Sequence, residues 1–336
     1  MRHQILAGWA GLLALGIVSA GWADVTLYAG QPAAEAGIAL RSWGAGTIED
    51  STETTFVGSR SIKVVTRGML SGGWVIFNRP VDLRADLNAP DKVLRFTLRF
   101  PGVSGASGGV SGPSGAPRGG PGFGGEGGAP RGGPGLGGGG LQGPGAPTGS
   151  GGGQATPPSL RELRIVFETS DGKRTETILP LQNLRTNESG WQSVSLPLSA
   201  VAGLRNTNGQ IAKLGLFGDT TGVFYIGEIR TLSEASPLQG YMAVQNAFGS
   251  VFTSRSQSRL SIASGDELIF FGVVEGVDTP VEYRWSFSDD PSQVDGVANG
   301  VRRRFPKRGN YTVYLTIADP YGNRPPATAK IEIQVN

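Results

Sequence analysis

The segments Tyr283-Arg-Trp-Ser-Phe-Ser-Asp-Asp290 and Gly309-Asn-Tyr-Thr-Val-Tyr-Leu-Thr-Ile-Ala-Asp319 decide the fold class of this 336-residue chain. Both alternate apolar and polar residues, which is the period of a half-buried β-strand. In the second segment, alternate residues from Tyr311 to Ile317 point to one face of a sheet, and the residues between them point to the other. No window of the sequence has convincing helical periodicity over three turns. The sequence therefore predicts an all-β protein.

Residues 258–336, which contain both segments, resemble the PKD family of immunoglobulin-like β-sandwiches. In that family a Trp-x-Phe-x-Asp strand end precedes a Gly-x-Tyr-x-Val strand, and here Trp285 and Phe287 occupy the two aromatic positions. The resemblance implies that both aromatic side chains lie in the core. It also implies a spacer or binding module of a secreted or cell-surface protein, rarely an enzyme. Ser288 and Asp290 stand where the family has glycine, so the turn that follows need not have the usual geometry.

The first 23 residues have the layout of a secretory signal peptide. A charged start at Arg2 precedes an apolar run over residues 5–18, and small residues lead to Ala23. We expect cleavage before Asp24, and an uncleaved membrane anchor is the alternative. No later segment approaches the length of a membrane span. The sequence thus predicts a protein that is secreted, periplasmic or exposed at the cell surface.

Cleavage would also remove His3, the only histidine, from a chain that has no cysteine. The mature chain then has no residues for Ser-His-Asp or Cys-His catalysis, for disulfides, or for ordinary zinc, haem or iron–sulfur sites. Chemistry that uses only carboxylates remains possible. The net charge is +3, or +2 without Arg2, which by itself indicates neither a nucleic-acid nor a membrane partner.

A Gly/Pro-rich segment, residues 101–158, interrupts the first part of the chain. Its composition cannot bury enough apolar surface to offset the entropy of ordering, so we expect a disordered loop. Strand patterns at 93–100 and 163–168 flank this segment. We therefore expect one sandwich with a long insertion, because the entropic cost of closing a loop rises only slowly with its length.

Three patterns in residues 24–235 resemble, in their order, the galactose-binding-like jelly rolls that include carbohydrate-binding modules. They are Gly58-Ser-Arg-Ser-Ile-Lys-Val64, Gly190-Trp-Gln-Ser-Val-Ser-Leu-Pro-Leu198, and Ile211-Ala-Lys-Leu-Gly-Leu-Phe217 followed by Phe224-Tyr-Ile-Gly-Glu-Ile-Arg230. The predicted organisation is a jelly-roll β-sandwich over residues 24–235, a linker over 236–257 and a PKD-like β-sandwich over 258–336.

Carbohydrate modules bind sugars on exposed aromatic rings, because the apolar face of a pyranose stacks on a ring while polar groups around it satisfy the hydroxyls. Trp43, Trp74 and Tyr225 are the candidate aromatic residues, and Arg67 is a candidate polar partner of Trp43. The alternative for each is ordinary packing in a core or loop.

The resemblance also implies a structural calcium site at the edge of the sandwich, made of carboxylate and carbonyl oxygens. Glu49, Asp50 and Glu228 are the candidate ligands. The family has an acidic residue one position earlier in the last strand, where this chain has Gly227. Surface carboxylates without a metal are the alternative.

One dense basic run, Arg302-Arg-Arg-Phe-Pro-Lys-Arg308, has two interpretations. It is either a charged edge strand, which discourages pairing between molecules, or a surface for an anionic partner. Aromatic residues are not interleaved as in RNA-binding sheets, so we expect no nucleic-acid partner.

These observations predict a secreted, non-catalytic recognition protein. The jelly roll would bind an extracellular polysaccharide, and the PKD-like domain would act as a spacer or contact a cell-surface protein. A first alternative is a structural component of the cell surface or matrix without a small ligand. A second is a carboxylate-dependent glycoside hydrolase or lyase.

Overall fold

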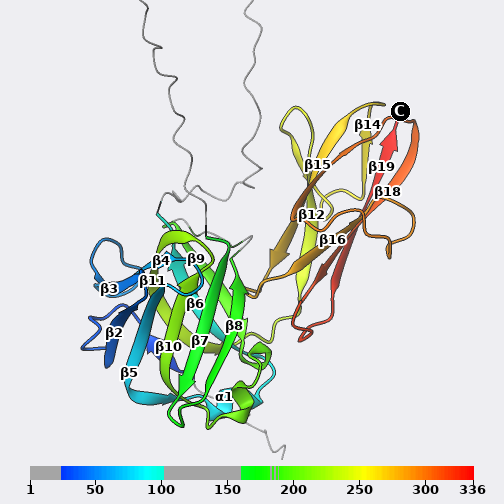
Figure 1. Cartoon of the computed structure of the whole chain (residues 1–336). Helices are drawn as coiled ribbons and strands as arrows, with labels where there is room; N and C mark the ends of the chain where they lie inside the picture. Colours follow the sequence, from blue (N-terminus) through cyan, green and yellow to red (C-terminus); the bar gives the residue numbers. More distant parts are fainter. Residues whose placement is uncertain (1–23, 102–159, 182–183, 185–186, 188) are drawn as a thin grey trace, which may run out of the picture.

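The computed structural model describes residues 24–101, 160–181, 184, 187 and 189–336, which form two β-sandwiches (Figure 1). The predicted signal peptide and the predicted insertion beyond Pro101 lie outside the described residues. In the described part of the chain, α1 (Arg84–Asn88) is the one α-helix and has five residues. The prediction of an all-β fold is confirmed.

The first sandwich packs a six-stranded sheet against a five-stranded sheet. The six-stranded sheet has the order β3-β4-β11-β6-β9, with β1 also paired to β11; its strands are β1 (Thr26–Tyr28), β3 (Thr47–Ser51), β4 (Ser61–Arg67), β6 (Lys92–Arg99), β9 (Trp191–Pro197) and β11 (Thr221–Ser233). The five-stranded sheet has the order β2-β5-β10-β7-β8; its strands are β2 (Ile38–Trp43), β5 (Gly72–Asp82), β7 (Glu162–Thr169), β8 (Arg174–Pro180) and β10 (Gln210–Gly218). Two 3₁₀ turns, η1 (Leu198–Ala200) and η2 (Leu204–Asn206), follow β9.

The core of this sandwich follows from the alternation of apolar residues along its strands. In β6, for example, Leu94, Phe96 and Leu98 are fully buried and belong to the main core cluster. The strands β6 and β7, which come before and after residues 102–159, lie in the two facing sheets and share this core. Both flanking segments therefore contribute to one sandwich.

The second sandwich packs two four-stranded sheets. One has the order β13-β12-β15-β17, with β12 (Gln239–Gln245), β13 (Val251–Thr253), β15 (Glu267–Glu275) and β17 (Gly300–Arg304). The other has the order β14-β19-β18-β16, with β14 (Arg259–Ile262), β16 (Glu282–Ser286), β18 (Gly309–Ala318) and β19 (Ala327–Val335). The edge strand β14 pairs with β19 in parallel, and every other strand pair is antiparallel among the described residues.

The alternation read in the C-terminal segments is confirmed. In β18, Val313 and Leu315 are fully buried in the second core. Trp285 is also fully buried, and its indole Nε1–H donates to the carbonyl oxygen of Ala298 at 2.8 Å. Phe287 packs against the same core. The basic run of residues 302–308 begins in β17, which is an edge strand of its sheet. This agrees with its interpretation as a charged edge strand.

The linker expected over residues 236–257 is corrected, because this segment contains β12 and β13. The strand β12 lies between β13 and β15, and its residues Met242 and Val244 are fully buried in the second core. The second sandwich thus begins earlier than expected, and residues 234–238 are the passage between the two sandwiches.

A buried polar cluster joins the two sandwiches at this passage; we call it the joint, and it consists of Glu234, Asp278, Thr279 and Arg324. The carboxylate of Glu234 accepts hydrogen bonds from the Asp278 backbone N–H at 2.7 Å, from the Thr279 hydroxyl and from the Arg324 guanidinium at 2.7 Å. The Ser195 backbone N–H in β9 donates to the Asp278 carbonyl oxygen at 2.9 Å. The loop between β15 and β16 therefore lies against the six-stranded sheet.

Candidate binding site: an aromatic groove on the five-stranded sheet

The outer face of the five-stranded sheet carries the two tryptophans predicted to bind sugar. Arg41 in β2 lies opposite Trp74 in β5, and Trp43 lies opposite Gly72. Because side chains alternate along a strand, Arg41, Trp43 and Trp74 share the face that points away from the core. The neighbours of Trp74 in the chain, Gly73 and Val75, face the core instead, and Val75 is fully buried there.

A glycine in β10 makes room for the ring of Trp74. Gly215 lies opposite Trp74, and a Cβ at this position would lie 2.9 Å from carbon atoms of both Trp74 and Phe217. The Trp74 ring meets the Phe217 ring edge to face, with centroids 5.8 Å apart and an interplanar angle of 81°. Trp74 therefore lies over the sheet rather than standing away from it, and is only 9% exposed.

Trp43 is the accessible aromatic residue of this face. Its side chain is 50% exposed. Its ring stands at 88° to that of Trp74, with centroids 6.5 Å apart. Trp43 thus packs against Trp74, which in turn packs against Phe217, while part of the Trp43 surface remains open to solvent.

Three charged residues from β7, β8 and β10 lie beside the tryptophans. Glu168 in β7 lies opposite both Lys213 and Arg174, and it accepts hydrogen bonds from Lys213 Nζ and from Arg174 Nε, the latter at 2.6 Å. Burial raises the pKa of Glu168, but the hydrogen bonds from Lys213 and Arg174 outweigh it and hold this pKa below the ordinary value of 4.5. The Arg174 guanidinium also lies over the Trp74 ring, 5.8 Å from its centroid.

Together these side chains enclose a hollow of about 130 Å³ that we call the aromatic groove. It is lined by Arg41, Trp43, Trp74, Ile76, Glu168, Arg174 and Lys213. A volume of this size equals the share of roughly four water molecules in the liquid. It therefore suits one ring or substituent of a ligand that extends along the sheet.

Tyr225 and Arg67 do not belong to this groove, because both lie in the six-stranded sheet. Tyr225 in β11 is buried, and its hydroxyl donates to Glu53. Burial raises the pKa of Tyr225, and the hydrogen bond to Glu53 raises it further. Arg67 is the last residue of β4. The predicted sugar-binding set is thus divided between the two sheets, with Trp43 and Trp74 together and the other two residues apart.

The three predicted calcium ligands do not converge. Glu49 in β3 lies 3.9 Å from Lys63 Nζ, and Asp50 accepts a hydrogen bond from the Ala33 backbone N–H at 2.7 Å. Glu228 lies 3.8 Å from a guanidinium nitrogen of Arg95. Burial raises the pKa of Glu228, and Arg95 opposes this shift. Among the described residues no three acidic side chains are grouped in a way that would hold a metal ion.

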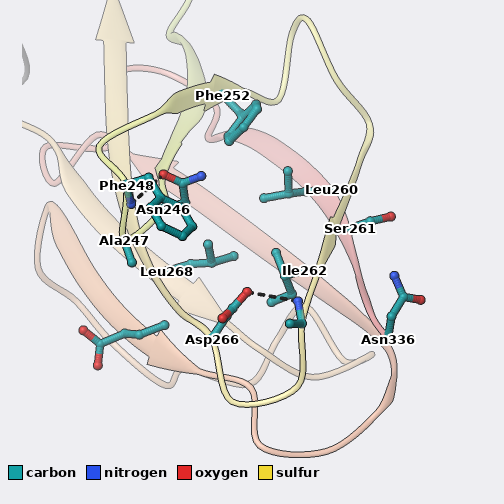
Figure 2. A pocket seen from close by; sticks show the side chains of 12 residues that line it. Asn246, Ala247, Phe248, Phe252, Leu260, Ser261, Ile262, Asp266, Leu268 and Asn336 are labelled. Atoms are coloured by element: carbon teal, nitrogen blue, oxygen red, sulfur yellow. Dashed lines mark hydrogen bonds between the residues drawn. The ribbon is translucent and has the colours of Figure 1, made fainter.

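A second hollow, of about 420 Å³, lies at one edge of the second sandwich, beside β14 (Figure 2). Phe252, Leu260 and Leu268 supply much of its apolar lining. Its polar groups serve their own turns: Asp266 accepts a hydrogen bond from the Ala263 backbone N–H at 3.0 Å, and Asn246 accepts one from that of Phe248 at 3.1 Å, as the dashed lines in Figure 2 show.

Comparison with known proteins identifies the second sandwich. Residues 257–335 match the family model described as PKD domain. The resemblance stated for residues 258–336 is confirmed; the match spans β14 to β19, and β12 and β13 complete the same sandwich, which we call the PKD domain. The match covers less than a quarter of the chain, and a search of the curated proteins finds no match.

Among solved structures, the chain is similar to one titled "Crystal Structure of Family 30 Carbohydrate Binding Module". The sequence identity is 13%, the TM-score is 0.32, and the match covers 64% of this chain and 89% of that chain. That protein is of the class to which the sequence of residues 24–235 pointed. At this TM-score, what the first sandwich binds must be argued from its own residues.

The sequence did not indicate that Glu168, Arg174 and Lys213 lie beside the two tryptophans. Glu168 and Arg174 flank the turn at Asp171 and Gly172, so their pairing across a hairpin follows from local sequence. Lys213 joins them only because β10 pairs with β7, a contact between distant segments that no local pattern contains. None of the helices in the described residues is long and apolar enough to cross a membrane.

Proposed function

We propose that this chain is a non-catalytic binding protein that holds carbohydrate in the aromatic groove. The observation that supports this proposal is Trp43, a half-exposed indole braced by Trp74 at the open side of a shallow hollow. A pyranose ring has apolar C–H faces that stack on such a surface. Trp74 stands edge to face with Trp43, so the Trp43 ring is held in place with part of its surface open, as stacking of a sugar ring requires.

The polar side chains around Trp43 suit the hydroxyl groups of a sugar. Arg174 and Lys213 supply N–H donors, and the Glu168 carboxylate supplies acceptor oxygens. Donors and acceptors at the edge of an aromatic surface give a stacked sugar its orientation. The groove therefore combines the two kinds of contact that sugar recognition needs.

The proposal gives the PKD domain the role of a spacer or a protein contact. The joint at Glu234 holds it beside the first sandwich, against the sheet opposite to the one with the groove. The aromatic groove then lies on the sheet that this contact does not use. A secreted, periplasmic or cell-surface location is part of the same proposal, and it rests on the signal-peptide pattern of residues 1–23.

A binding screen with residues 24–336 tests the proposal. Immobilised and soluble polysaccharides are compared by retention and by affinity electrophoresis, for the wild type, Trp43→Ala and Phe248→Ala. Phe248 is a matched control, because it is a strongly exposed aromatic residue of the second sandwich. We expect Trp43→Ala to weaken binding at least tenfold, which corresponds to about 1.4 kcal/mol, and Phe248→Ala to leave it unchanged.

Three results would overturn this proposal. Retention that Trp43→Ala leaves intact would place the sugar site elsewhere on the chain, and its loss in Phe248→Ala would place it at the second hollow. No retention on any glycan would favour a structural surface component without a small ligand.

A further inference from the structure

The aromatic groove carries an excess of positive charge. Arg41, Arg174 and Lys213 line it, against one carboxylate, that of Glu168. Neutral sugars need donors and acceptors but no net charge. Three cations facing one acid are therefore more than a neutral sugar requires, and they favour an anion.

Arg41 is the cation that remains available. Arg174 and Lys213 both hydrogen-bond to Glu168, so that carboxylate already has two charged partners. Within the described residues Arg41 forms no ion pair, and its exposed side chain lines the groove, in β2 opposite Trp74 and two residues before Trp43. A guanidinium binds the two oxygens of a carboxylate or a sulfate with two parallel N–H donors.

We propose that the ligand of the aromatic groove is an anionic polysaccharide whose sugar ring stacks on Trp43 while its acidic group pairs with Arg41. This inference rests on the proposed function and adds the class of sugar. The acidic group is a carboxylate, as in a uronic acid, or a sulfate ester, since both present two coplanar or near-coplanar oxygens to the guanidinium. Lys213 and Arg174 supply the surrounding positive potential, and Glu168 keeps them in place.

The experiment compares polysaccharides that differ only in charge. Polygalacturonate is paired with its methyl ester, which has the same backbone without the carboxylate charge, and dextran sulfate is paired with dextran. Alginate and hyaluronate extend the carboxylate arm to other uronic acids, and cellulose and xylan extend the neutral arm. We expect at least tenfold tighter binding to an anionic member than to its neutral partner, and the arm that binds tells carboxylate from sulfate.

Three variants test the residues. Arg41→Gln should weaken binding of the anionic glycan at least tenfold, whereas Arg302→Gln, which removes an exposed arginine of the second sandwich, should not. Glu168→Gln keeps a hydrogen-bond acceptor for Lys213 but removes the negative charge, so it should tighten binding of the anionic glycan severalfold. Raising NaCl from about 0.05 to 0.5 M should weaken binding, because the Debye length falls from above 10 Å toward 3 Å.

The outcomes separate this inference from the proposed function. If the protein retains only neutral glycans and Trp43→Ala abolishes that retention, the inference of an anionic ligand is overturned and the proposed function remains. No retention of any glycan would overturn both. Equal loss in Arg41→Gln and Arg302→Gln would indicate unspecific charge attraction and would also overturn the inference. Circular dichroism and thermal melting of each variant show whether it is folded.

Discussion

Replacing Arg324 with Met should loosen the joint between the two sandwiches. Arg324 is 9% exposed and its partner Glu234 is 8% exposed, with 2.7 Å between the guanidinium nitrogen and the carboxylate oxygen. At that distance the gross attraction is about 6 kcal/mol for an effective dielectric constant of about 20. Desolvation of both charges offsets most of it. Removal of one partner leaves the other charge buried, which costs about 3–5 kcal/mol.

The geometry of Glu234 also predicts what a second change would restore. Its Oε1 accepts from the Asp278 N–H and its Oε2 from the Thr279 hydroxyl and Arg324. A Gln carbonyl oxygen can still accept from the Asp278 N–H, and the Gln amide N–H can then donate to the Thr279 hydroxyl oxygen. Glu234→Gln in the Arg324→Met background removes the unpaired charge. We therefore expect the double variant to recover about half or more of the lost free energy, which is a coupling that a double-mutant cycle measures.

Urea unfolding of residues 24–336, followed by tryptophan fluorescence and far-UV circular dichroism, provides the assay. The matched control is Arg259→Met, which breaks a pair with Glu332 at 2.9 Å whose side chains are 60% and 40% exposed. An exposed pair of this kind contributes at most about 1 kcal/mol. If Arg324→Met costs no more than Arg259→Met, the reasoning that the joint is buried and holds the sandwiches together is refuted.

Three further predictions concern the first sandwich. Gly215→Ala places a Cβ 2.9 Å from ring carbons of Trp74 and Phe217, so it should cost about 1–3 kcal/mol and weaken glycan retention; Gly222→Ala, where the nearest atom is 3.7 Å away, is the neutral control in thermal melts. Glu168 has a folded-state pKa below its ordinary value of 4.5, so its stabilising contribution is present above about pH 4.5 and is lost as the pH falls through that lower pKa. Glu168→Gln should therefore flatten this part of the dependence of melting temperature on pH. An unchanged slope in the variant would contradict this prediction. Chelation with EDTA should leave the melting temperature unchanged, because the candidate calcium ligands diverge, whereas a drop would require a metal site made of other oxygens.

Local sequence was sufficient for the parts of the fold that depend on local alternation. The buried residues Val313 and Leu315 of β18 could be predicted because a strand that covers a core repeats every two residues. β12 was not recognised, although Met242 and Val244 alternate there, because the run is short and contains small and polar neighbours. What establishes it as a strand is its pairing with β15, a contact with a segment nearly thirty residues further along the chain.

The same limit applied to the candidate site. Trp43 was predicted to be exposed, and it is. Tyr225 was grouped with it as another aromatic residue of the first domain, but the sheet that a strand joins is decided by long-range pairing. The sequence can indicate which residues of a strand point away from the core. It cannot indicate which strands lie in the same sheet, and so which of these residues come together on one surface.

The position of the groove follows from what covers the other sheet. On the outer face of the six-stranded sheet, the ring of Phe56 in the loop between β3 and β4 packs against Trp191, with centroids 5.5 Å apart. The loop between β15 and β16 reaches the same sheet through Asp278, which accepts from the backbone N–H of Ser195. Both contacts cover part of the six-stranded sheet or of its β9 edge. The five-stranded sheet carries Trp43 on its outer face, so an extended polysaccharide can lie across that sheet without displacing any part of the fold described here.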